Sequence, residues 1–494
     1  MINDFNYVAP ETEGIDSKDV LELLSFIDRF NINIYSFILA RNGNILAEGY
    51  YKPMHENFMH RLYSSSKTYV AIAIGLLYGE GKLKLEDKLI DYFPEVSREG
   101  VSEWVLNCTI EHALQMNVPG TGAYINEEDW GLAFFSKNAP AEKPSGCLYR
   151  YDTGATTTLN RLVEKLAGMK MVDYMRPLFD KIGVSKDIWC VETPEGYSWG
   201  GSGVICTTRD FAKFGELLMN MGNYKGEQLI PYEYMERATK TRVISNVRVN
   251  RAGTYHSCGY GYQIWQSPNG FWLAGMGGQE VFCYPEKNMI FVVNADTQGG
   301  NGDILSDAVD HFIYDRIGEK KEPGKDYEIL KEKLANLKIK TDFGTKTHER
   351  AKLVNGKTYE LLENTCGWRN FRLDFTEDEG TITYETDRGV KTIPFGLCEY
   401  KSIKFPETHY YDKRVKTPSN REFDGIACGA WNVNNLLIKV FITDTNKGNL
   451  FINVGFTNDL KETVVMLNKS AEFFLDEYDG NDFGGHIVGK LKEE

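Results

Sequence analysis

The stretch Ser64-Ser65-Ser66-Lys67 places a hydroxyl and an amine at a spacing that suits nucleophilic catalysis. Residues three apart lie on one face of a helix, so the side chains of Ser64 and Lys67 would point the same way. The positive end of a helix favours an oxyanion on the serine and lowers the pKa of a nearby ammonium group. A lysine held neutral there can take the serine proton. The same four residues also fit a serine-rich helix start followed by a solvated lysine.

The segment after this motif favours the catalytic interpretation. Residues 68–78 are almost entirely apolar, and glycines at 79 and 81 mark the end of a predicted helix. A helix that is apolar on all sides is buried. We therefore expect Ser64 and Lys67 at the buried start of a central helix.

The elements that must position these residues follow an order that predicts one sheet with a helical cluster. Residues 33–51 have the period of a β-hairpin around Asn42-Gly43, and strand patterns return at 259–266, 270–274, 280–284 and 289–295. We expect the first strands to pair with the last in an antiparallel sheet, an α/β fold of the α+β type and not a doubly wound one. Helices are predicted at 17–30, 109–116, 155–167, 172–182, 208–220 and 303–317.

A second domain is predicted after a charged stretch. Residues 318–350 are rich in charge and contain one predicted helix. Residues 357–475 offer many short alternating strands with turn residues between them, as in a β-barrel or a sandwich. We predict a first domain over 1–320, a linker over 321–350 and an all-β, barrel-like domain over 351–494.

Composition limits the partners and the compartment. A formal net charge of −14 argues against binding to nucleic-acid phosphates. The nine cysteines are widely spaced without a CxxC pair, and no HExxH occurs, so we expect free thiols and no metal site. The sequence has neither a signal-peptide pattern nor an apolar run long enough to span a bilayer, so we expect a cytoplasmic protein without a membrane partner.

Several segments in a fixed order carry a resemblance to a known family. They are ILARNGNILAEGYYKP, HRLYSSSKTYVAIAIGLLYGEGKLKLEDKLIDYFPE, TIEHALQM, PSGCLYRYDTGATTTLNRLVEKLAG, GGSGVICTTRDFAKFGELLMNMGNYKGEQLI, YGYQIW and GMGGQEVFCYPEKNMIFVVNAD. Through them, residues 8–317 resemble the penicillin-recognising serine hydrolases, which include class C β-lactamases, DD-peptidases, esterases and 6-aminohexanoate-dimer hydrolases. The resemblance implies a β-lactamase/transpeptidase-like fold with Ser64 as nucleophile and Lys67 as base. The C-terminal domain is similar, more loosely, to lipocalin-like β-domains appended to some of these enzymes.

The second motif of this family is a tyrosine followed two residues later by a polar side chain, usually asparagine. The lead PSGCLYRY over 144–151 matches the family pattern, so the resemblance makes Tyr151 the catalytic tyrosine. A phenol beside a lysine can pass the serine proton to the leaving group. The alternative is a core tyrosine with a satisfied hydroxyl. Thr153 stands in place of the asparagine, and it cannot offer an amide's donor and acceptor together.

The third motif is usually Lys-Thr-Gly or His-Thr-Gly on a sheet strand, and the alignment sets Met276-Gly277-Gly278 on it. Glycines let a substrate's backbone or acyl oxygen approach closely. The resemblance implies an oxyanion hole formed by the N–H groups of Ser64 and Gln279, or of Gly278 if the register is shifted by one. The alternative is that GMGGQ is only a bulge or turn. A cation is missing where β-lactamases and carboxypeptidases hold the substrate carboxylate.

Two further segments receive a place from the resemblance but no chemistry. The segment GGSG at 200–203 is similar to the small-residue turn that borders the family's pocket. Tyr260, Tyr262 and Trp265 either line the site or form a buried aromatic cluster.

The motifs together predict hydrolysis of a small-molecule ester or amide through a covalent Ser64 intermediate, without a metal or an organic cofactor. The missing cation argues against β-lactams and D-Ala-D-Ala peptides, although Arg150 is near Tyr151 in the sequence and could replace it. The alternatives are a D-stereospecific peptidase or β-lactamase, and a catalytically silent homologue that binds a ligand. The sequence leaves the natural substrate and the oligomeric state open.

Overall fold

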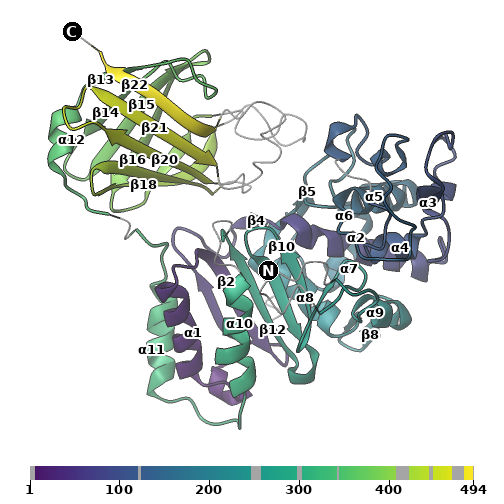
Figure 1. Ribbon diagram of the computed structural model, residues 1–494. Helices are drawn as coiled ribbons and strands as arrows, with labels where there is room; N and C mark the ends of the chain where they lie inside the picture. The colour runs from purple at the N-terminus through teal and green to yellow at the C-terminus, as the bar shows by residue number, and fades with distance from the viewer. Residues whose placement is uncertain are drawn as a thin grey trace. The chain divides into compact units, whose positions relative to one another are not determined.

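The computed structural model describes residues 6–120, 124–245, 258–297, 303–341, 344–407, 422–443, 449–469 and 483–492. The chain divides into two compact units, Met1–Ile339 and Lys340–Glu494 (Figure 1). Within the described ranges, no helix combines the length and apolar character needed to cross a membrane.

The first unit is built on a seven-stranded sheet in the order β1-β3-β2-β12-β11-β10-β9. β2 pairs antiparallel with β12, so the first hairpin and the last strands share one sheet, which confirms the prediction. All other neighbours are antiparallel except β1 and β3, which are parallel. The strands are β1 (Asn6–Tyr7), β2 (Ile34–Arg41), β3 (Asn44–Tyr50), β9 (Trp265–Ser267), β10 (Gly270–Gly275), β11 (Gln279–Tyr284) and β12 (Met289–Ala295).

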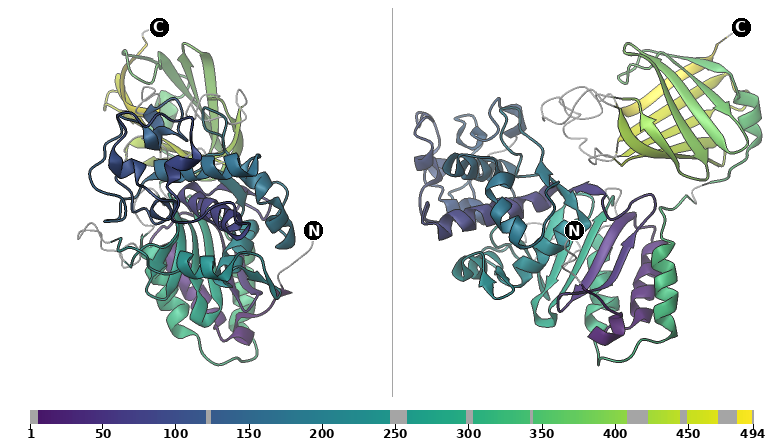
Figure 2. Two further views of the ribbon diagram at one scale, coloured as in Figure 1. Left: turned by 90° about the vertical axis from the view of Figure 1, so that its right-hand side faces the viewer. Right: turned by 180° about the vertical axis from the view of Figure 1, so that it is seen from behind.

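Helices cover both faces of this sheet. α1 (Ser17–Arg29), α10 (Asp303–Phe312) and α11 (Lys325–Ala335) lie on one face, and α8 (Thr208–Met219) packs on the other (Figure 1). The buried apolar residues of α1 recur every three or four positions, as they must for one helical face to meet a sheet. Figure 2 shows α1 and α11 side by side from behind.

The helical cluster is centred on α2 (Ser66–Gly79), which packs against α5 (Thr153–Ala167). Every residue of α2 from Ser66 to Gly75 is buried, so the predicted central helix is confirmed. A helix without a polar stripe has to be enclosed on all sides. The start of α2 is therefore surrounded by protein and not by solvent.

The charged stretch after the sheet contains α11, and α11 belongs to the first unit. Leu330 of α11 is fully buried, and Lys333 Nζ lies 2.6 Å from Asp28 Oδ2 of α1. The boundary between the units falls after Ile339, so residues 321–339 belong to the first unit, whereas the sequence predicted a linker over 321–350. The contacts with α1 come from residues about 300 positions away, and local charge density does not reveal them.

The second unit is a closed all-β barrel, as predicted. Its ten-stranded sheet has the order β16-β15-β14-β13-β22-β21-β20-β19-β18-β17, and β16 also pairs with β18, which closes the barrel. Buried and less buried residues alternate along β15, so one face of the strand fills the interior. The strands are β13 (Thr358–Leu361), β14 (Asn370–Phe375), β15 (Glu379–Thr386), β16 (Gly389–Leu397), β17 (Lys401–Phe405), β18 (Phe423–Asn432), β19 (Asn435–Ile442), β20 (Asn449–Phe456), β21 (Glu462–Lys469) and β22 (Gly484–Leu491).

Candidate active site

Ser64 and Lys67 meet at the start of α2. Ser64 lies in the 3₁₀ turn Tyr63–Ser65 that leads into the helix, and it is only partly buried, so a substrate can reach it. Lys67 Nζ donates a hydrogen bond to Ser64 Oγ at 3.0 Å and a second one to the carbonyl oxygen of Gly201 at 2.6 Å. Because Lys67 is 1% exposed, these protein groups rather than water solvate its amine.

The three serines of the motif have different surroundings. Ser65 Oγ donates to the carbonyl oxygen of Gln279 at 2.7 Å, and Ser66 Oγ accepts from the N–H of Val204 at 3.0 Å. Both side chains therefore tie the start of α2 to neighbouring segments. Ser64 is left as the serine that faces the lysine amine.

The electrostatic environment of Lys67 suits a base. Burial lowers the pKa of Lys67 from 10.5 to about 7, and the negative charge of Asp152 opposes part of this shift. A substantial neutral fraction therefore exists near pH 7. When the amine has lost one proton, it can still donate to the Gly201 carbonyl while its lone pair faces the Ser64 hydroxyl.

Tyr151 lies beside both groups. Its ring centroid is 5.0 Å from Lys67 Nζ, and its hydroxyl makes a hydrogen bond with Ser64. Burial raises the pKa of Tyr151 to about 12, while the Ser64 contact opposes the shift. The residue as a whole is 36% exposed. The ring stacks on Trp265 at 5.8 Å, which makes Trp265 a neighbour of the site.

The start of α5 holds Tyr151 and Thr153 in place. Asp152 is the N-cap of α5, and its Oδ1 accepts from the N–H of Ala155 at 3.1 Å. Thr153 is the first helical residue, and its methyl group packs on Gly201: a Cβ at Gly201 would lie 2.6 Å from Thr153 Cγ2. A side chain at position 201 would therefore clash with Thr153, and the Gly201 carbonyl that accepts from Lys67 lies next to Thr153.

The third motif forms the turn between β10 and β11, directly against the nucleophile. A Cβ at Gly275 would lie 2.1 Å from the carbonyl oxygen of Leu62, so the two segments are in close contact. Gly277 and Gly278 have φ values of +82° and +89°, a region that favours glycine. GMGGQ therefore does form a turn, as the alternative interpretation held. The same turn places Met276–Gln279 next to the nucleophile.

The two candidate oxyanion donors, Gly278 and Gln279, differ in the hydrogen bonds that their backbones make. The N–H of Gly278 donates to the carbonyl oxygen of Gly275 at 3.1 Å within the turn. Gln279 begins β11, and its carbonyl oxygen accepts from Ser65, so its backbone is fastened to the segment that carries Ser64. This geometry favours the N–H of Gln279 over that of Gly278 as the second donor.

A buried arginine supports the site, and the sequence did not single it out. Arg61 is fully buried, and its guanidinium lies between the rings of Tyr63 at 4.6 Å and Trp199 at 4.8 Å. Its Nε donates to the carbonyl oxygen of Ser202 at 2.9 Å, next to Gly201. The GGSG segment thus accepts hydrogen bonds from two buried basic side chains, from Lys67 at Gly201 and from Arg61 at Ser202. The resemblance had assigned it no such role.

Arg150 does not supply the cation that is missing from the third motif, because it pairs with Glu142. Arg150 Nη1 pairs with Glu142 Oε2 at 3.0 Å, and both side chains are about half exposed. Met276, which the resemblance aligns with the family's Lys or His, lies in the turn between β10 and β11. Within the described part of the chain, no group of three or more His, Cys, Asp or Glu side chains is arranged to hold a metal ion.

Comparison with known proteins assigns the family. The β-lactamase family model matches residues 35–314, more than half of the chain, and the chain belongs to this family of serine hydrolases. Among curated proteins, it is 22% identical over 218 residues to the 6-aminohexanoate-dimer hydrolase of Paenarthrobacter ureafaciens, covering 41% of this chain and 56% of that one. The match thus spans little more than half the length of that relative.

Two solved structures are similar to this chain. A penicillin-binding protein homologue from Caulobacter crescentus matches with a TM-score of 0.50 and 16% identity, covering 61% of this chain and 99% of that one. An octameric penicillin-binding protein homologue from Pyrococcus abyssi matches with a TM-score of 0.47 and 15% identity, covering 96% of this chain and 100% of that one.

Proposed function

We propose that this protein hydrolyses an ester or amide bond of a small, neutral molecule through an acyl-enzyme on Ser64. One observation carries the proposal: a buried lysine amine lies 3.0 Å from a partly exposed serine hydroxyl, with its pKa lowered to about 7. A buried ammonium without a carboxylate in contact is unfavourable for folding, and catalysis gives a reason for such a group to be kept.

The proposed reaction has two acyl-transfer steps. Lys67, with Tyr151, takes the Ser64 proton while Oγ attacks the carbonyl carbon, and the oxyanion accepts hydrogen bonds from the N–H groups of Ser64 and Gln279. Tyr151 then protonates the leaving group. Because the pKa of Tyr151 is about 12, this phenol keeps its proton where Lys67 is already neutral. Water, activated by the same pair, releases the acyl group and restores the serine.

The charges around the site support a neutral substrate. A substrate carboxylate needs a fixed cation, because an unpaired buried charge is strongly destabilising. Met276 is apolar, and Arg150 is paired with Glu142. The stacked rings of Tyr151 and Trp265 offer an apolar surface next to Ser64 instead. Amide cleavage is supported in addition by the name of the Paenarthrobacter relative, a 6-aminohexanoate-dimer hydrolase.

Covalent labelling tests this proposal. The purified protein should react with a fluorophosphonate probe and hydrolyse p-nitrophenyl butyrate, and Ser64→Ala should abolish both. Ser66→Ala is the matched control, since it removes a neighbouring buried hydroxyl that bonds to the backbone, and it should keep measurable labelling. If the labelled peptide contains a different serine, or if the wild-type protein neither labels nor turns over esters and amides, the protein is a silent ligand-binding homologue or uses another nucleophile.

A further inference from the structure

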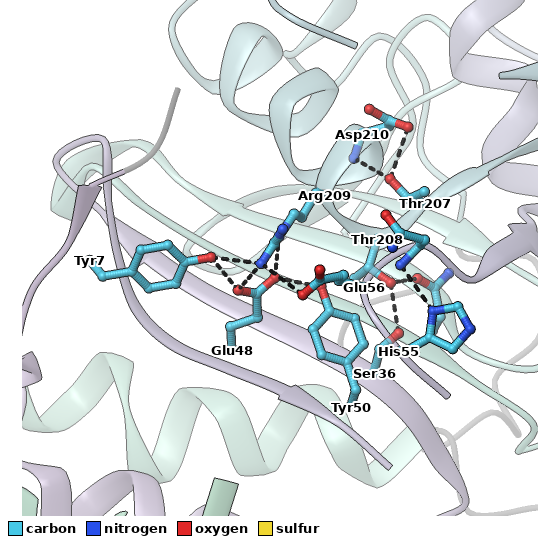
Figure 3. A network of polar contacts seen from close by, with 12 residues as sticks. Tyr7, Ser36, Glu48, Tyr50, His55, Glu56, Thr207, Thr208, Arg209 and Asp210 are labelled. Atoms are coloured by element: carbon cyan, nitrogen blue, oxygen red, sulfur yellow. Dashed lines mark hydrogen bonds and ion pairs between the residues drawn. The ribbon is translucent and has the colours of Figure 1, made fainter. Parts of the chain in front are cut away.

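A row of buried polar side chains runs through the first unit and ends at Gln279. His60 Nε2 lies 3.4 Å from Ser36 Oγ, and Ser36 Oγ lies 2.7 Å from Thr208 Oγ1. Thr208 Oγ1 lies 2.9 Å from Asn294 Oδ1, and Asn294 Nδ2 lies 3.0 Å from Gln279 Oε1. Each of these residues is at most 1% exposed. Figure 3 shows the Ser36–Thr208 contact.

The direction of every hydrogen bond in this row can be derived from one backbone carbonyl. The carbonyl oxygen of Ala295 lies 2.6 Å from the Gln279 amide and can only accept, so Nε2 of Gln279 faces it. Oε1 of Gln279 then points to Asn294, which must present its NH₂ group there and its Oδ1 to Thr208. Flipping either amide would set two acceptors against each other.

The same logic fixes the hydroxyls. Thr208 uses its proton on Asn294, so Ser36 must donate to Thr208. Ser36 then accepts from His60, which requires the tautomer with hydrogen on Nε2. All donors therefore point from His60 towards Gln279. Such an aligned chain strengthens each of its bonds and leaves one arrangement for the whole row.

The row ends at Gln279, the residue that directly follows the third motif. The Asn294 side chain and the Ala295 carbonyl oxygen both bond to the same residue, Gln279. The pairing of β12 with β2 shifts register between Asn294 and Ala295, and Tyr35 is the extra residue in β2. The Gln279 backbone is held separately, because its carbonyl oxygen accepts from Ser65. Gln279 is thus fixed at both amide atoms of its side chain and at its main chain.

We propose that Asn294 and Thr208 are positioning residues for the oxyanion hole: they hold Gln279 so that its N–H stays aimed at the reacting carbonyl beside Ser64. This inference rests on the proposed acyl-transfer function. Neither residue touches the substrate. Their effect on the reaction passes through Gln279, whose N–H has to match the oxyanion more closely than the planar carbonyl of the bound substrate.

The test uses Thr208→Val, Asn294→Asp and the conservative Thr208→Ser. Thr208→Val removes the hydroxyl at nearly constant volume, and Asn294→Asp sets an acceptor against Gln279 Oε1. Deleting one oxyanion donor lowers kcat by roughly 10²–10³-fold, so displacing one should lower kcat by about tenfold. We expect KM for p-nitrophenyl butyrate to change less than twofold and the affinity for phenylboronic acid, which forms a tetrahedral adduct with the serine, to fall in parallel with kcat. Thr208→Ser should recover most of both.

The control is Tyr234→Phe, which removes another fully buried hydroxyl bond in the same unit, from Tyr234 to the carbonyl oxygen of Ala71 at 2.6 Å. It should lower the melting temperature while kcat and boronate affinity stay unchanged. If Thr208→Val and Asn294→Asp behave like this control, the row is structural only and the inference is overturned. Ser64→Ala, assayed in parallel, separates the two proposals: wild-type turnover that survives in Ser64→Ala overturns both, whereas turnover lost in Ser64→Ala and unaffected in Thr208→Val overturns this one alone.

Discussion

Lys67 and Arg209 are two basic side chains of the same unit with opposite environments. Arg209 is held by Glu48 through two contacts, Nε–Oε1 at 2.7 Å and Nη2–Oε2 at 3.0 Å, and Tyr7 and Tyr50 also donate to that carboxylate (Figure 3). The hydrogen bond to Glu48 raises the pKa of Arg209 further. Lys67 contacts a hydroxyl and a carbonyl instead, and burial lowers its pKa to about 7.

The difference separates a structural charge from a chemical one. Burial alone would raise the pKa of Glu48, but the hydrogen bonds from Arg209 and Tyr50 outweigh it and the pKa is lowered, so the pair stays ionised and rigid. A base needs the reverse: a proton that leaves near working pH. The same unit thus keeps one cation by pairing it and makes another labile by surrounding it with neutral groups.

The largest effect should follow from replacing the labile cation. Lys67→Met should lower kcat for a neutral ester by about 100-fold or more, the scale of acid–base catalysis. It should also raise the melting temperature, because it removes a buried amine whose charged form is disfavoured. The folded pKa of about 7 lies below the ordinary 10.5, so the gain in melting temperature should be larger at pH 6 than at pH 10. Steady-state assays and thermal unfolding at both pH values measure this, and a variant that loses stability together with activity would contradict the comparison.

Substrate charge should have the next largest effect. A neutral ester such as p-nitrophenyl butyrate should exceed a chromogenic cephalosporin in kcat/KM by at least about tenfold, since an unpaired substrate carboxylate costs several kcal/mol when it is buried. Met276→Lys should narrow the gap, and the size-matched neutral Met276→Leu should not. A wild-type enzyme that prefers the cephalosporin by tenfold would mean that another cation supplies the missing charge.

The pH dependence of kcat/KM should report the Lys67 amine. A base acts when it is deprotonated, so kcat/KM should rise with pH and reach half of its plateau near pH 7. The charge of Asp152 raises the pKa of Lys67, and Asp152→Asn removes this charge while leaving an oxygen that can cap α5. The midpoint should therefore move to lower pH in Asp152→Asn. Asp173→Asn, the same change at an exposed residue of α6 (Met171–Tyr174), should leave the midpoint in place.

The smallest effect on activity should come from breaking the paired charge. Glu48→Gln should destabilise the first unit by about 1–3 kcal/mol, because Arg209 loses its partner, and kcat should stay within about twofold of wild type. The low pKa of Glu48 contributes stability above its unfolded value near 4.5, and that contribution should fade as the pH drops below it. Urea unfolding at pH 7 measures the loss. Glu56→Gln is the control, since Glu56 is half exposed and lies 3.7 Å from Arg209.

Much of the fold was predictable because its signals are local. The period of the first hairpin, the apolar run of α2 and the alternation in the barrel strands each depend on neighbouring residues. The strand predicted at 259–266 fails for a local reason: Gln263 has a φ of +55°, and the N–H of Gly261 bonds to the carbonyl oxygen of Ile264, so only Trp265–Ser267 remain as β9. Alternation of apolar residues does not reveal a single left-handed residue.

The candidate site was predictable to the extent that its motifs are short and ordered. The structure brings Ser64, Lys67, Tyr151 and the turn 276–279 next to one another, and their roles stay a prediction. The Gly201 carbonyl, the buried Arg61 and the row from His60 to Gln279 were not predicted. The Gly201 and Arg61 contacts join residues 134 and 141 positions apart, and the row includes one contact between residues 172 positions apart. A carbonyl or a buried Thr looks the same in the sequence wherever it is used.

The backbone conformation of Tyr63 determines at which stage the free energy needed to orient the Ser64 N–H is lost. Its φ of +47° lies in the left-handed region, which costs a residue with a side chain about 1–2 kcal/mol. This residue immediately precedes Ser64, so the peptide unit that carries the Ser64 N–H is oriented by an unfavourable conformation that the buried Tyr63 ring and its neighbours maintain. The free energy needed to orient the Ser64 N–H is therefore lost once, when the chain folds. The amide does not have to reorient in each catalytic cycle.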